Sequence, residues 1–366
     1  MSSELQVPVT TISNIKKHPS ADRLQIAEIL GWQCVVPKGI YFENQAVVYF
    51  PPDTLLPTEV SDKMGVTQYL SVKQEGNESW GRVRSIRLRG EPSFGFCHPV
   101  DILKELAPDK VFSNDENVAD LFRAKKYEPP IRNHHVNGSK GFAEDSLPDH
   151  PLFPRYTDIE NFRRYPNIIE EGEDVIISEK LDGQLCRIGH ILDGESWVWM
   201  AGSNRVRRSF PKEDVSKSQF WYPFESPELS NLILHLSQKA KQVIVYGESY
   251  GASIQKFKYD SPNKANFRMF DILVDGKYLD FPAFAVLAVK FHVPTVPMLF
   301  TGKFSKDLLQ LADGESMLGG NCKEGIVIAP VKERLHPKTG RVKLKYHSNE
   351  YLIMKGKKGF QDYTDV

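Results

Sequence analysis

The sequence predicts an α+β protein in which a small N-terminal β-barrel precedes a larger domain of antiparallel sheets with flanking helices. Short β-rich runs separated by turn residues extend from Val7 to about Pro99, a pattern typical of a small barrel. After Ile168, longer apolar runs follow one another without a regular helix between each pair, which favours antiparallel sheets. The chain has 366 residues, more than the roughly 250–300 at which single cores usually stop growing, so two domains are expected.

The domain boundaries are predicted from changes in local composition. Trp32–Val36 and Ala46–Phe50 are β-rich runs, and Pro37-Lys38-Gly39 between them is typical of a turn. Further along, Tyr127-Glu128-Pro129-Pro130 opens a polar stretch rich in Asn, His, Gly, Ser and Lys. The expected parts are the barrel at residues 1–105, a linker at residues 106–150 and the larger domain at residues 151–366.

Apolar runs in the larger domain predict its main elements. The helix is expected between Pro227 and Ala240. The strands are expected around Val175–Ile177, Val243–Tyr246, Ile326–Ile328 and Val342–Leu344.

Overall composition excludes several classes of protein. Lys plus Arg and Asp plus Glu number 47 each, so any attraction to nucleic acid must come from local patches. The most apolar stretch, Phe281–Phe300, is interrupted by Lys290, His292, Pro294 and Pro297, which a membrane span of about 20 residues would not accept. The four cysteines form no Cys-x-x-Cys pair, and the first residues do not resemble a signal peptide. We expect a monomer in a reducing intracellular compartment, cytoplasm or nucleus, without a membrane partner.

One short motif introduces the expected chemistry. Lys180-Leu181-Asp182-Gly183 ends a buried-looking strand with a lysine, a carboxylate and a turn-forming glycine. Alone, this motif is equally compatible with a surface hairpin that carries a salt-bridged lysine. Four further motifs follow it in order, namely Val245–Glu248, Phe267–Ile272, Lys323–Ile328 and Val342–Tyr346. The ordered set resembles motifs I, III, IIIa, IV and V of the covalent nucleotidyltransferases, which include ATP- and NAD-dependent ligases and mRNA capping enzymes.

This resemblance implies that Lys180 is the catalytic nucleophile that takes AMP from ATP. A free lysine has a pKa near 10.4, so nearby positive charge and partial desolvation must lower it before the amine can attack a phosphate. Alternation along a strand places Lys343 and Lys345 on one face, toward the same phosphates, while Val342 and Leu344 face a core. The alternative is an amphipathic exposed strand.

The expected metal ligands are the carboxylates of three motifs. Asp182, Glu248 and Glu324 each lie beside a glycine, at Gly183, Gly247 and Gly325, which permits close backbone approach. Oxygen ligands of this kind suit Mg²⁺ (or Mn²⁺), which would offset the charge of the triphosphate.

The resemblance also implies the remaining ATP contacts. Glu179 would lie beside the adenine, and Phe270 would stack on it, although Phe270 could instead be a core residue. An arginine of motif Ia is expected at Arg205, with Arg207 as the runner-up. The predicted ATP-binding residues are Glu179, Lys180, Arg205, Glu248, Phe270, Lys343 and Lys345.

Other residues indicate one branch of this superfamily. His18–Leu24, Gly31–Val36, Ser85–Gly90 and the Gly247–Gly251 segment, with the barrel in front and few residues after Lys345, resemble the fifth family of ATP-dependent RNA ligases, which has an N-terminal OB domain. The implied substrate is RNA with 3′-OH and 5′-phosphate ends, duplex or nicked, as in RNA repair. The alternatives are an RNA-binding OB adaptor with a degenerate transferase domain, and a DNA ligase or guanylyltransferase.

A run of arginines in the barrel is the expected RNA-binding surface. Arg82, Arg84, Arg87 and Arg89 could follow a phosphate backbone, or could simply keep an edge strand from aggregating. Strict alternation would place Arg82 and Arg84 on the face of Ile86 and Leu88. We therefore expect a β-bulge near Ser85 that brings the four arginines together.

Overall fold

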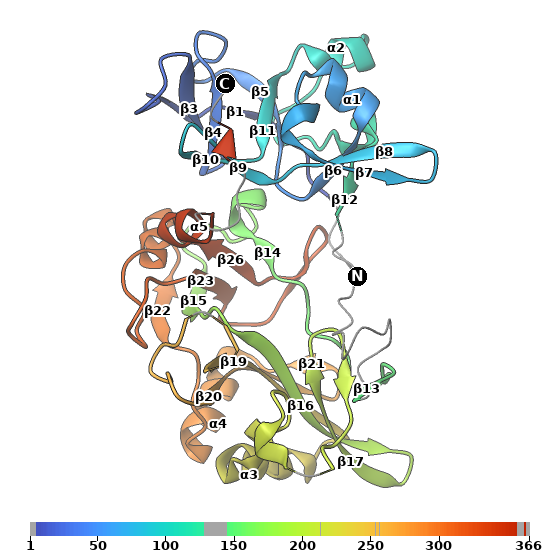
Figure 1. Ribbon diagram of the computed structural model, residues 1–366. Coiled ribbons are helices and arrows are strands. Elements are labelled where there is room, and N and C mark those ends of the chain that lie inside the picture. The colour runs from blue at the N-terminus through green and yellow to red at the C-terminus, as the bar shows by residue number, and fades with distance from the viewer. Residues whose placement is uncertain are drawn as a thin grey trace. The chain divides into compact units, whose positions relative to one another are not determined.

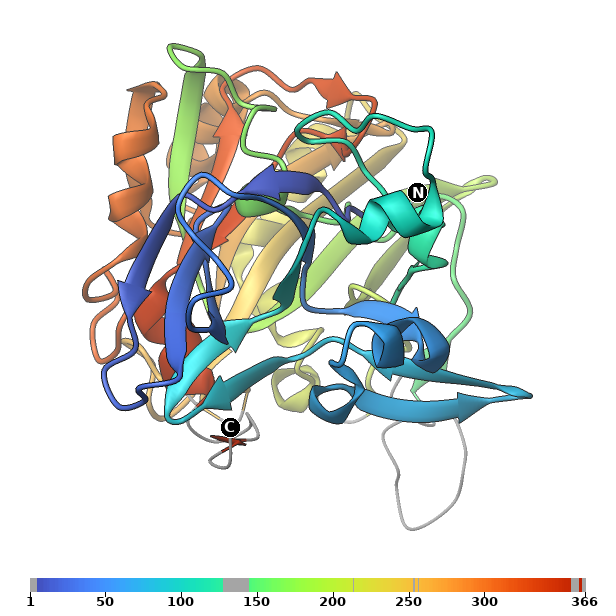
Figure 2. The ribbon, with the colours of Figure 1, turned by 90° about the horizontal axis from the view of Figure 1, so that it is seen from above.

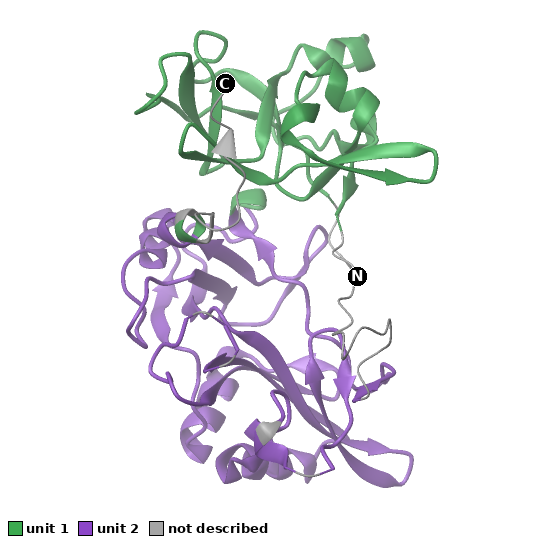
Figure 3. Cartoon of the chain, viewed as in Figure 1, with its two compact units in different colours: residues 1–130, 163–166, 352–366 green, residues 131–162, 167–351 purple. Residues whose placement is uncertain are grey.

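The computed structural model describes residues 5–127, 145–212, 214–252, 254–255, 257–356 and 362–363. The chain divides into two units (Figure 3). Unit 1 comprises residues 1–130, 163–166 and 352–366, and unit 2 comprises residues 131–162 and 167–351. No helix in these described ranges is both long and apolar enough to cross a membrane.

Unit 1 contains short strands in four small sheets, with α1 (Thr58–Lys63) and α2 (Ile102–Leu106) beside them. The first sheet has the spatial order β1 (Val9–Thr11), β5 (Ala46–Phe50), β11 (Phe96–Pro99), and the second has the order β10 (Glu91–Phe94), β9 (Ser85–Leu88), β27 (Asp362–Tyr363). The third sheet has the order β12 (Lys125–Lys126), β6 (Thr54–Pro57), β8 (Glu78–Arg82), β7 (Ser71–Glu75). The fourth sheet has the order β2 (Asn14–Lys17), β3 (Leu24–Ile29), β4 (Trp32–Pro37). The β7–β8 hairpin projects from the rest of the unit in two perpendicular views (Figures 1 and 2).

Strand β5 supports two hydrophobic clusters at once. Val47 and Tyr49 pack into one cluster, while Val48 and Phe50 pack into another. Because successive side chains of a strand point to opposite faces, a continuous apolar run is what a strand buried on both faces requires. This explains why Ala46–Phe50 shows no polar alternation.

Unit 2 contains two large sheets. The seven-stranded sheet is β13 (Ser146–Leu147), β18 (Arg207–Arg208), β17 (Ser196–Ser203), β16 (Gln184–Asp193), β19 (Gln242–Gly251), β20 (Ala265–Val274) and β21 (Lys277–Tyr278). The five-stranded sheet is β14 (Glu160–Asn161), β26 (Leu344–His347), β23 (Gly325–Pro330), β15 (Asp174–Lys180) and β22 (Met298–Lys303), and β24 (Leu335–His336) pairs with β25 (Gly340–Arg341). Apart from the parallel pair β14 and β26, the pairings within these sheets are antiparallel, which confirms the α+β prediction.

Helices α3 (Pro227–Ser237) and α4 (Phe281–Phe291) cover one face of the seven-stranded sheet (Figure 1). The predicted helix is confirmed in α3, whose first turn is capped by Ser226 Oγ, which accepts from Leu229 N at 3.2 Å. Helix α4 was not predicted, because its apolar residues surround the helix and hide the period. Helix α5 (Asn349–Gly356) begins in unit 2 and ends in unit 1, and short 3₁₀ turns occur at Thr67–Tyr69, Ala119–Phe122, Phe162–Arg164, Val215–Lys217, Tyr222–Glu225 and Lys306–Ala312.

Two details of the strand predictions need correction. The expected strand at Val342–Leu344 begins only at Leu344, because the chain has just left β25 and first crosses to pair with β23. The expected bulge near Ser85 is wrong. Instead, strand β8 ends at Arg82, and β8 and β9 belong to different sheets. Val83 at this break is buried, so the interruption aligns an apolar side chain with the core.

The predicted linker at residues 106–150 lies partly outside the described residues, since residues 128–144, including Glu128-Pro129-Pro130, are not described. Within its described part, Val118, Ala119 and Phe122 are buried in the core of unit 1. The boundaries at residues 105 and 150 stay predictions.

We expect Phe122→Ala to destabilise unit 1, because Phe122 is fully buried and packs edge-on against Phe50 with ring centroids 5.0 Å apart. The loss should be about 3–5 kcal/mol in the opening free energy measured by amide hydrogen exchange of β5. The control is Leu106→Ala, which removes an exposed side chain. Unchanged exchange in Phe122→Ala would mean that the segment after residue 105 does not stabilise the barrel.

Candidate active site

Unit 2 contains a cavity of about 300 Å³ that is lined by strands of both large sheets. Six of the predicted site residues line it. These residues are Glu179, Lys180, Glu248, Phe270, Lys343 and Lys345. They come from β15, β19, β20, β26 and the segment before β26, so motifs far apart in sequence converge. The lysines offer positive charge and Phe270 offers a flat apolar surface, a combination that suits an anionic ligand carrying an aromatic ring.

Lys180 ends β15 and lies among carboxylates. Its backbone pairs with Gly325 of β23, which brings Lys180 Nζ to 2.9 Å from Glu324 Oε1. Burial alone would lower the pKa of Lys180, but Glu324 and Glu248 outweigh burial and raise that pKa above its ordinary value. The amine is therefore protonated in the ligand-free site and must lose its proton before it can act as a nucleophile.

The two glutamates beside Lys180 have opposite pKa shifts. Burial raises the pKa of Glu248 to about 8, and the charges of Glu324 and Asp182 add to this effect. Burial would also raise the pKa of Glu324, but Lys180 and a hydrogen bond from His347 lower it to about 2. The cluster around Lys180 thus holds more acidic groups than this one lysine can balance.

The chemistry of these acids suits a divalent cation. Within the described part of the chain, Glu324 Oε2 is buried without a hydrogen-bond donor, and no three His, Cys, Asp or Glu side chains converge as a preformed metal site. An orphaned carboxylate oxygen beside Glu248 and Asp182 is the kind of hard donor set that Mg²⁺ or Mn²⁺ binds. The residues fit such an ion, although the other oxygen of Glu324 forms an ion pair with Lys180.

The three glycines of these motifs allow close approach, as expected. A Cβ atom at Gly183 would clash with Ser249 O and the Glu248 side chain. At Gly247 it would clash with the Phe267 ring. At Gly325 it would clash with Tyr346 O. Each glycine therefore lets a neighbouring strand or a functional side chain approach the cavity.

Phe270 reaches the cavity because of a β-bulge. Tyr246 pairs with Asp271 and Gly247 pairs with Met269, so Phe270 is the extra residue of β20. A bulge re-aims the extra side chain. The ring packs against Tyr156 with centroids 5.1 Å apart, and Lys343 Nζ lies 5.4 Å from its centroid.

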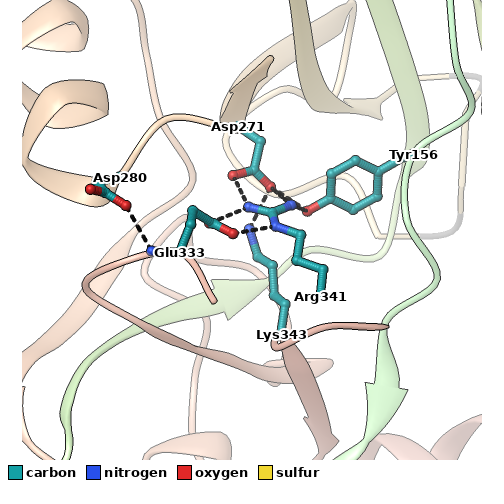
Figure 4. A network of polar contacts seen from close by, with 6 residues as sticks. All are labelled: Tyr156, Asp271, Asp280, Glu333, Arg341 and Lys343. Carbon is teal, nitrogen blue, oxygen red and sulfur yellow. Dashed lines mark hydrogen bonds and ion pairs between the residues drawn. The ribbon is translucent and has the colours of Figure 1, made fainter. Parts of the chain in front are cut away.

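Lys343 is held by a buried polar network (Figure 4). Its Nζ donates to Asp271 Oδ2 at 2.6 Å, and Arg341 donates to both oxygens of Asp271, at 2.8 and 3.0 Å. Tyr156 also donates its hydroxyl to Asp271, and Arg341 Nε donates to Glu333 Oε2 at 2.7 Å. Burial and Arg341 lower the pKa of Lys343, whereas the two cations lower the pKa of Asp271 despite its burial.

Several residues of this site were not predicted. Tyr156 and Arg341 lie outside the five motifs, and only their positions in the fold bring them to Asp271. Ser316 and Met317 were also missed. Glu179 accepts hydrogen bonds from Ser316 Oγ and from Met317 N, the latter at 2.9 Å, so its carboxylate is tied to this loop.

The expected motif Ia arginine lies away from the cavity lining. Arg205 is exposed in the turn between β17 and β18, and Arg207 Nη1 contacts Met200 Sδ at 3.6 Å. Among the described residues, the cavity lining includes Asn204 and neither of these arginines. The conformation of this turn, which the sequence could not predict, decides which side chain reaches the cavity.

The four barrel arginines lie in unit 1 in different surroundings. Arg82 forms an ion pair with Asp53 at 2.6 Å and stacks on Tyr127. Arg84 donates to Ser71 Oγ at 3.3 Å and is exposed, as is Arg89. Arg87 is partly buried and donates to Gly90 O. Arg82 therefore has a structural partner, whereas Arg84 and Arg89 present more surface to solvent.

Comparison with known proteins agrees with this arrangement. Residues 173–347 match the RNA ligase family model, and residues 6–100 match an OB-fold domain model. None of the curated proteins matches the chain. The match at residues 173–347 contains Lys180, Glu248, Phe270, Glu324 and Lys343.

Solved structures of Naegleria gruberi RNA ligase share the fold over nearly the whole chain. A lysine-to-alanine variant with ATP and Mn has a TM-score of 0.68 at 22% identity, covering 96% of this chain and 99% of that one. A glutamate-to-alanine variant with AMP and Mn has a TM-score of 0.69 at 23% identity, covering 97% and 99%. The ligase with PPi has a TM-score of 0.65 at 22% identity, covering 96% and 98%.

The resemblance expected from the ordered motifs is thus confirmed, together with the OB fold of the N-terminal barrel. Residues 173–347 are thus similar to the RNA ligase family, and a region similar to an OB-fold domain lies on their N-terminal side.

Proposed function

We propose that the chain is an ATP-dependent RNA ligase that joins 3′-OH and 5′-phosphate ends of duplex or nicked RNA, as a monomer, through a covalent AMP on Lys180. The observation that carries this proposal is the position of Lys180 in a cavity that also contains Lys343, Lys345 and Phe270. The likeness to ligase structures solved with ATP, AMP, PPi and Mn supports the choice of nucleotide and ion.

The first step joins Lys180 to the nucleotide. Lys180 Nζ, once deprotonated, attacks the α-phosphorus of ATP, a P–N bond forms, and the P–O bond to pyrophosphate breaks. Lys343 and Lys345 would bind the phosphates through charge-assisted hydrogen bonds. AMP then passes to the RNA 5′-phosphate, and the 3′-hydroxyl displaces AMP to form the phosphodiester.

The carboxylates of Asp182, Glu248 and Glu324 are the groups proposed to hold a divalent cation. When bound, Mg²⁺ or Mn²⁺ supplies positive charge that offsets both the carboxylates and the triphosphate. Because the same carboxylates raise the pKa of Lys180, any ligand that neutralises them favours the unprotonated amine. Glu324 would then exchange its ion pair with Lys180 for contact with that ligand.

We expect Lys180→Ala to remain folded and to form no covalent AMP, because the nucleophile is lost from a strand end that tolerates alanine. The measurement is transfer of label from ATP or GTP to the protein, followed on a denaturing gel. Lys303→Ala removes an exposed lysine of β22 and serves as the control that still becomes labelled. Label on the Lys180→Ala protein would contradict the proposal, and label from GTP alone would indicate a guanylyltransferase.

Glu248→Gln should stabilise the metal-free protein at pH 9 and change little at pH 5. The folded-state pKa of about 8 lies above the unfolded value of about 4.3, so the folded state binds the extra proton between these values. The free energy of unfolding therefore falls as pH rises through this window in the wild type, and Gln removes that loss. Urea unfolding with a chelator, with exposed Glu195→Gln as control, measures the difference. An effect equal at both pH values would contradict the shifted pKa.

Replacing Arg87 and Arg89 with Ala should weaken sealing of duplex RNA ends while self-adenylation persists. Each lost phosphate contact should reduce the slope of log affinity against log salt by roughly 0.9. The comparison is ligation against self-adenylation across a salt series, with Arg123→Ala, which removes an exposed ion-paired arginine of unit 1, as the matched control. If ligation and adenylation fall together, the arginines serve the fold, and if neither changes, they do not bind RNA.

A further inference from the structure

Asn204 is a polar cavity residue for which the predicted motifs give no role. It lies in the turn between β17 and β18 and is partly buried. It lines the same cavity as Lys180, Lys343 and Lys345. An uncharged amide among three lysines does not add to the charge of the site, so its contribution must come from hydrogen bonds.

The turn that carries Asn204 is held rigidly. Ser203 N donates to Val206 O at 3.0 Å, and Ser203 Oγ accepts from the backbone N–H groups of Val206 and Arg205, at 3.1 and 3.3 Å. Gly202 makes this possible, because a Cβ atom there would clash with Val206 O. A side chain on a turn fixed in this way loses little freedom when a ligand binds.

The orientation of the Asn204 amide is determined by its partner. Tyr156 N lies 3.0 Å from one terminal atom of the side chain. A backbone N–H can only donate, so this atom must be the oxygen Oδ1. The amide nitrogen Nδ2 therefore diverges from Tyr156 N and presents two donor hydrogens elsewhere.

We propose that Asn204 is a nucleotide-binding residue whose Nδ2 donates to an oxygen of the bound nucleotide, either a ribose hydroxyl or a phosphate. This inference deepens the proposed function and rests on the cavity being the ATP site. The contact from Tyr156 N prepares Asn204 for this role, because it fixes which amide atom faces away. Tyr156 also donates to Asp271, the partner of Lys343, so the two nucleotide contacts share one support.

The test uses a substitution that separates ligand binding from support of Tyr156. Asn204→Asp keeps an oxygen that can accept from Tyr156 N, but it replaces the donor with a second, negatively charged acceptor. We expect it to weaken ATP binding by about tenfold or more, since a donor is lost and an anion faces an anionic ligand. ATP affinity is measured in a Lys180→Ala background, where no AMP transfer can occur. Asn231→Asp, the same change on the exposed surface of α3, is the matched control.

Two analogues identify the oxygen. If removal of the 2′- or the 3′-hydroxyl from ATP weakens binding to the protein with Asn204 but not to the Asn204→Asp protein, Asn204 contacts that hydroxyl. If each deoxy analogue loses as much affinity on the Asn204→Asp protein as on the protein with Asn204, the contact is to a phosphate. Either result supports the proposal.

Other results would overturn it. Weak ATP binding in Asn204→Ala but normal binding in Asn204→Asp would mean that Asn204 only supports Tyr156. Normal binding in both, with a loss in Arg205→Ala, would favour the neighbouring arginine. A wild-type protein that binds ATP but never becomes labelled would contradict the proposed ligase activity, and the affinity comparison would still decide the role of Asn204.

Discussion

The carboxylate of Asp271 organises one side of the cavity, because three side chains from two distant segments depend on it. Arg341, Lys343 and Tyr156 all donate to Asp271, and Arg341 also pairs with a second carboxylate, Glu333. In such a buried cluster, removing one partner leaves a charge without compensation, which typically costs about 3–5 kcal/mol. Lys343 therefore has a fixed position before any ligand arrives, and it keeps its charge near the cavity despite being almost fully buried.

Close backbone approach is the second constraint on the site. Gly183 lets β19 approach the turn that follows Lys180, Gly247 lets β20 approach β19, which carries Glu248, and Gly325 lets β26 approach β23, which follows Glu324. The bulge at Phe270 follows from the same crowding, since β20 shifts register opposite Gly247. Sheet geometry thus delivers an aromatic ring, two carboxylates and a lysine to one cavity without a long loop.

How much of this could be predicted from the sequence depends on the range of the interaction. Alternation predicted that Val342 and Leu344 face a core and that Lys343 and Lys345 face the other way. The side chains have this arrangement although β26 begins only at Leu344. The partners of Lys343 could not be predicted, because Tyr156 and Arg341 reach Asp271 only through pairing of segments more than 60 residues apart. Glu179 shows the same limit, since its hydrogen bonds to Ser316 and Met317 span a long separation.

Errors arose where a turn or a strand break reset the alternation. The prediction for the barrel arginines assumes one strand from Arg82 to Arg89. Buried Val83 instead separates β8 from β9, and Arg82 forms an ion pair with Asp53. At the turn between β17 and β18, the resemblance implied Arg205, with Arg207 as the runner-up. Among the described residues, the cavity lining includes their neighbour Asn204 instead, because residue order does not reveal which side chain of a tight turn points inward.

The two central lysines are prepared in opposite ways, and this difference follows from their partners. Lys180 lies beside Glu324 and Glu248, and its pKa is raised, so the site holds the proposed nucleophile in its protonated, unreactive form. Lys343 shares one carboxylate with Arg341, and its pKa is lowered, since burial and a neighbouring cation both oppose its charge. An anionic ligand near Lys343 would raise the pKa of Lys343 again, whereas positive charge near the acidic cluster would lower the pKa of Lys180. The two ends of the cavity therefore respond to opposite charges, and a nucleotide bound together with a divalent cation supplies both.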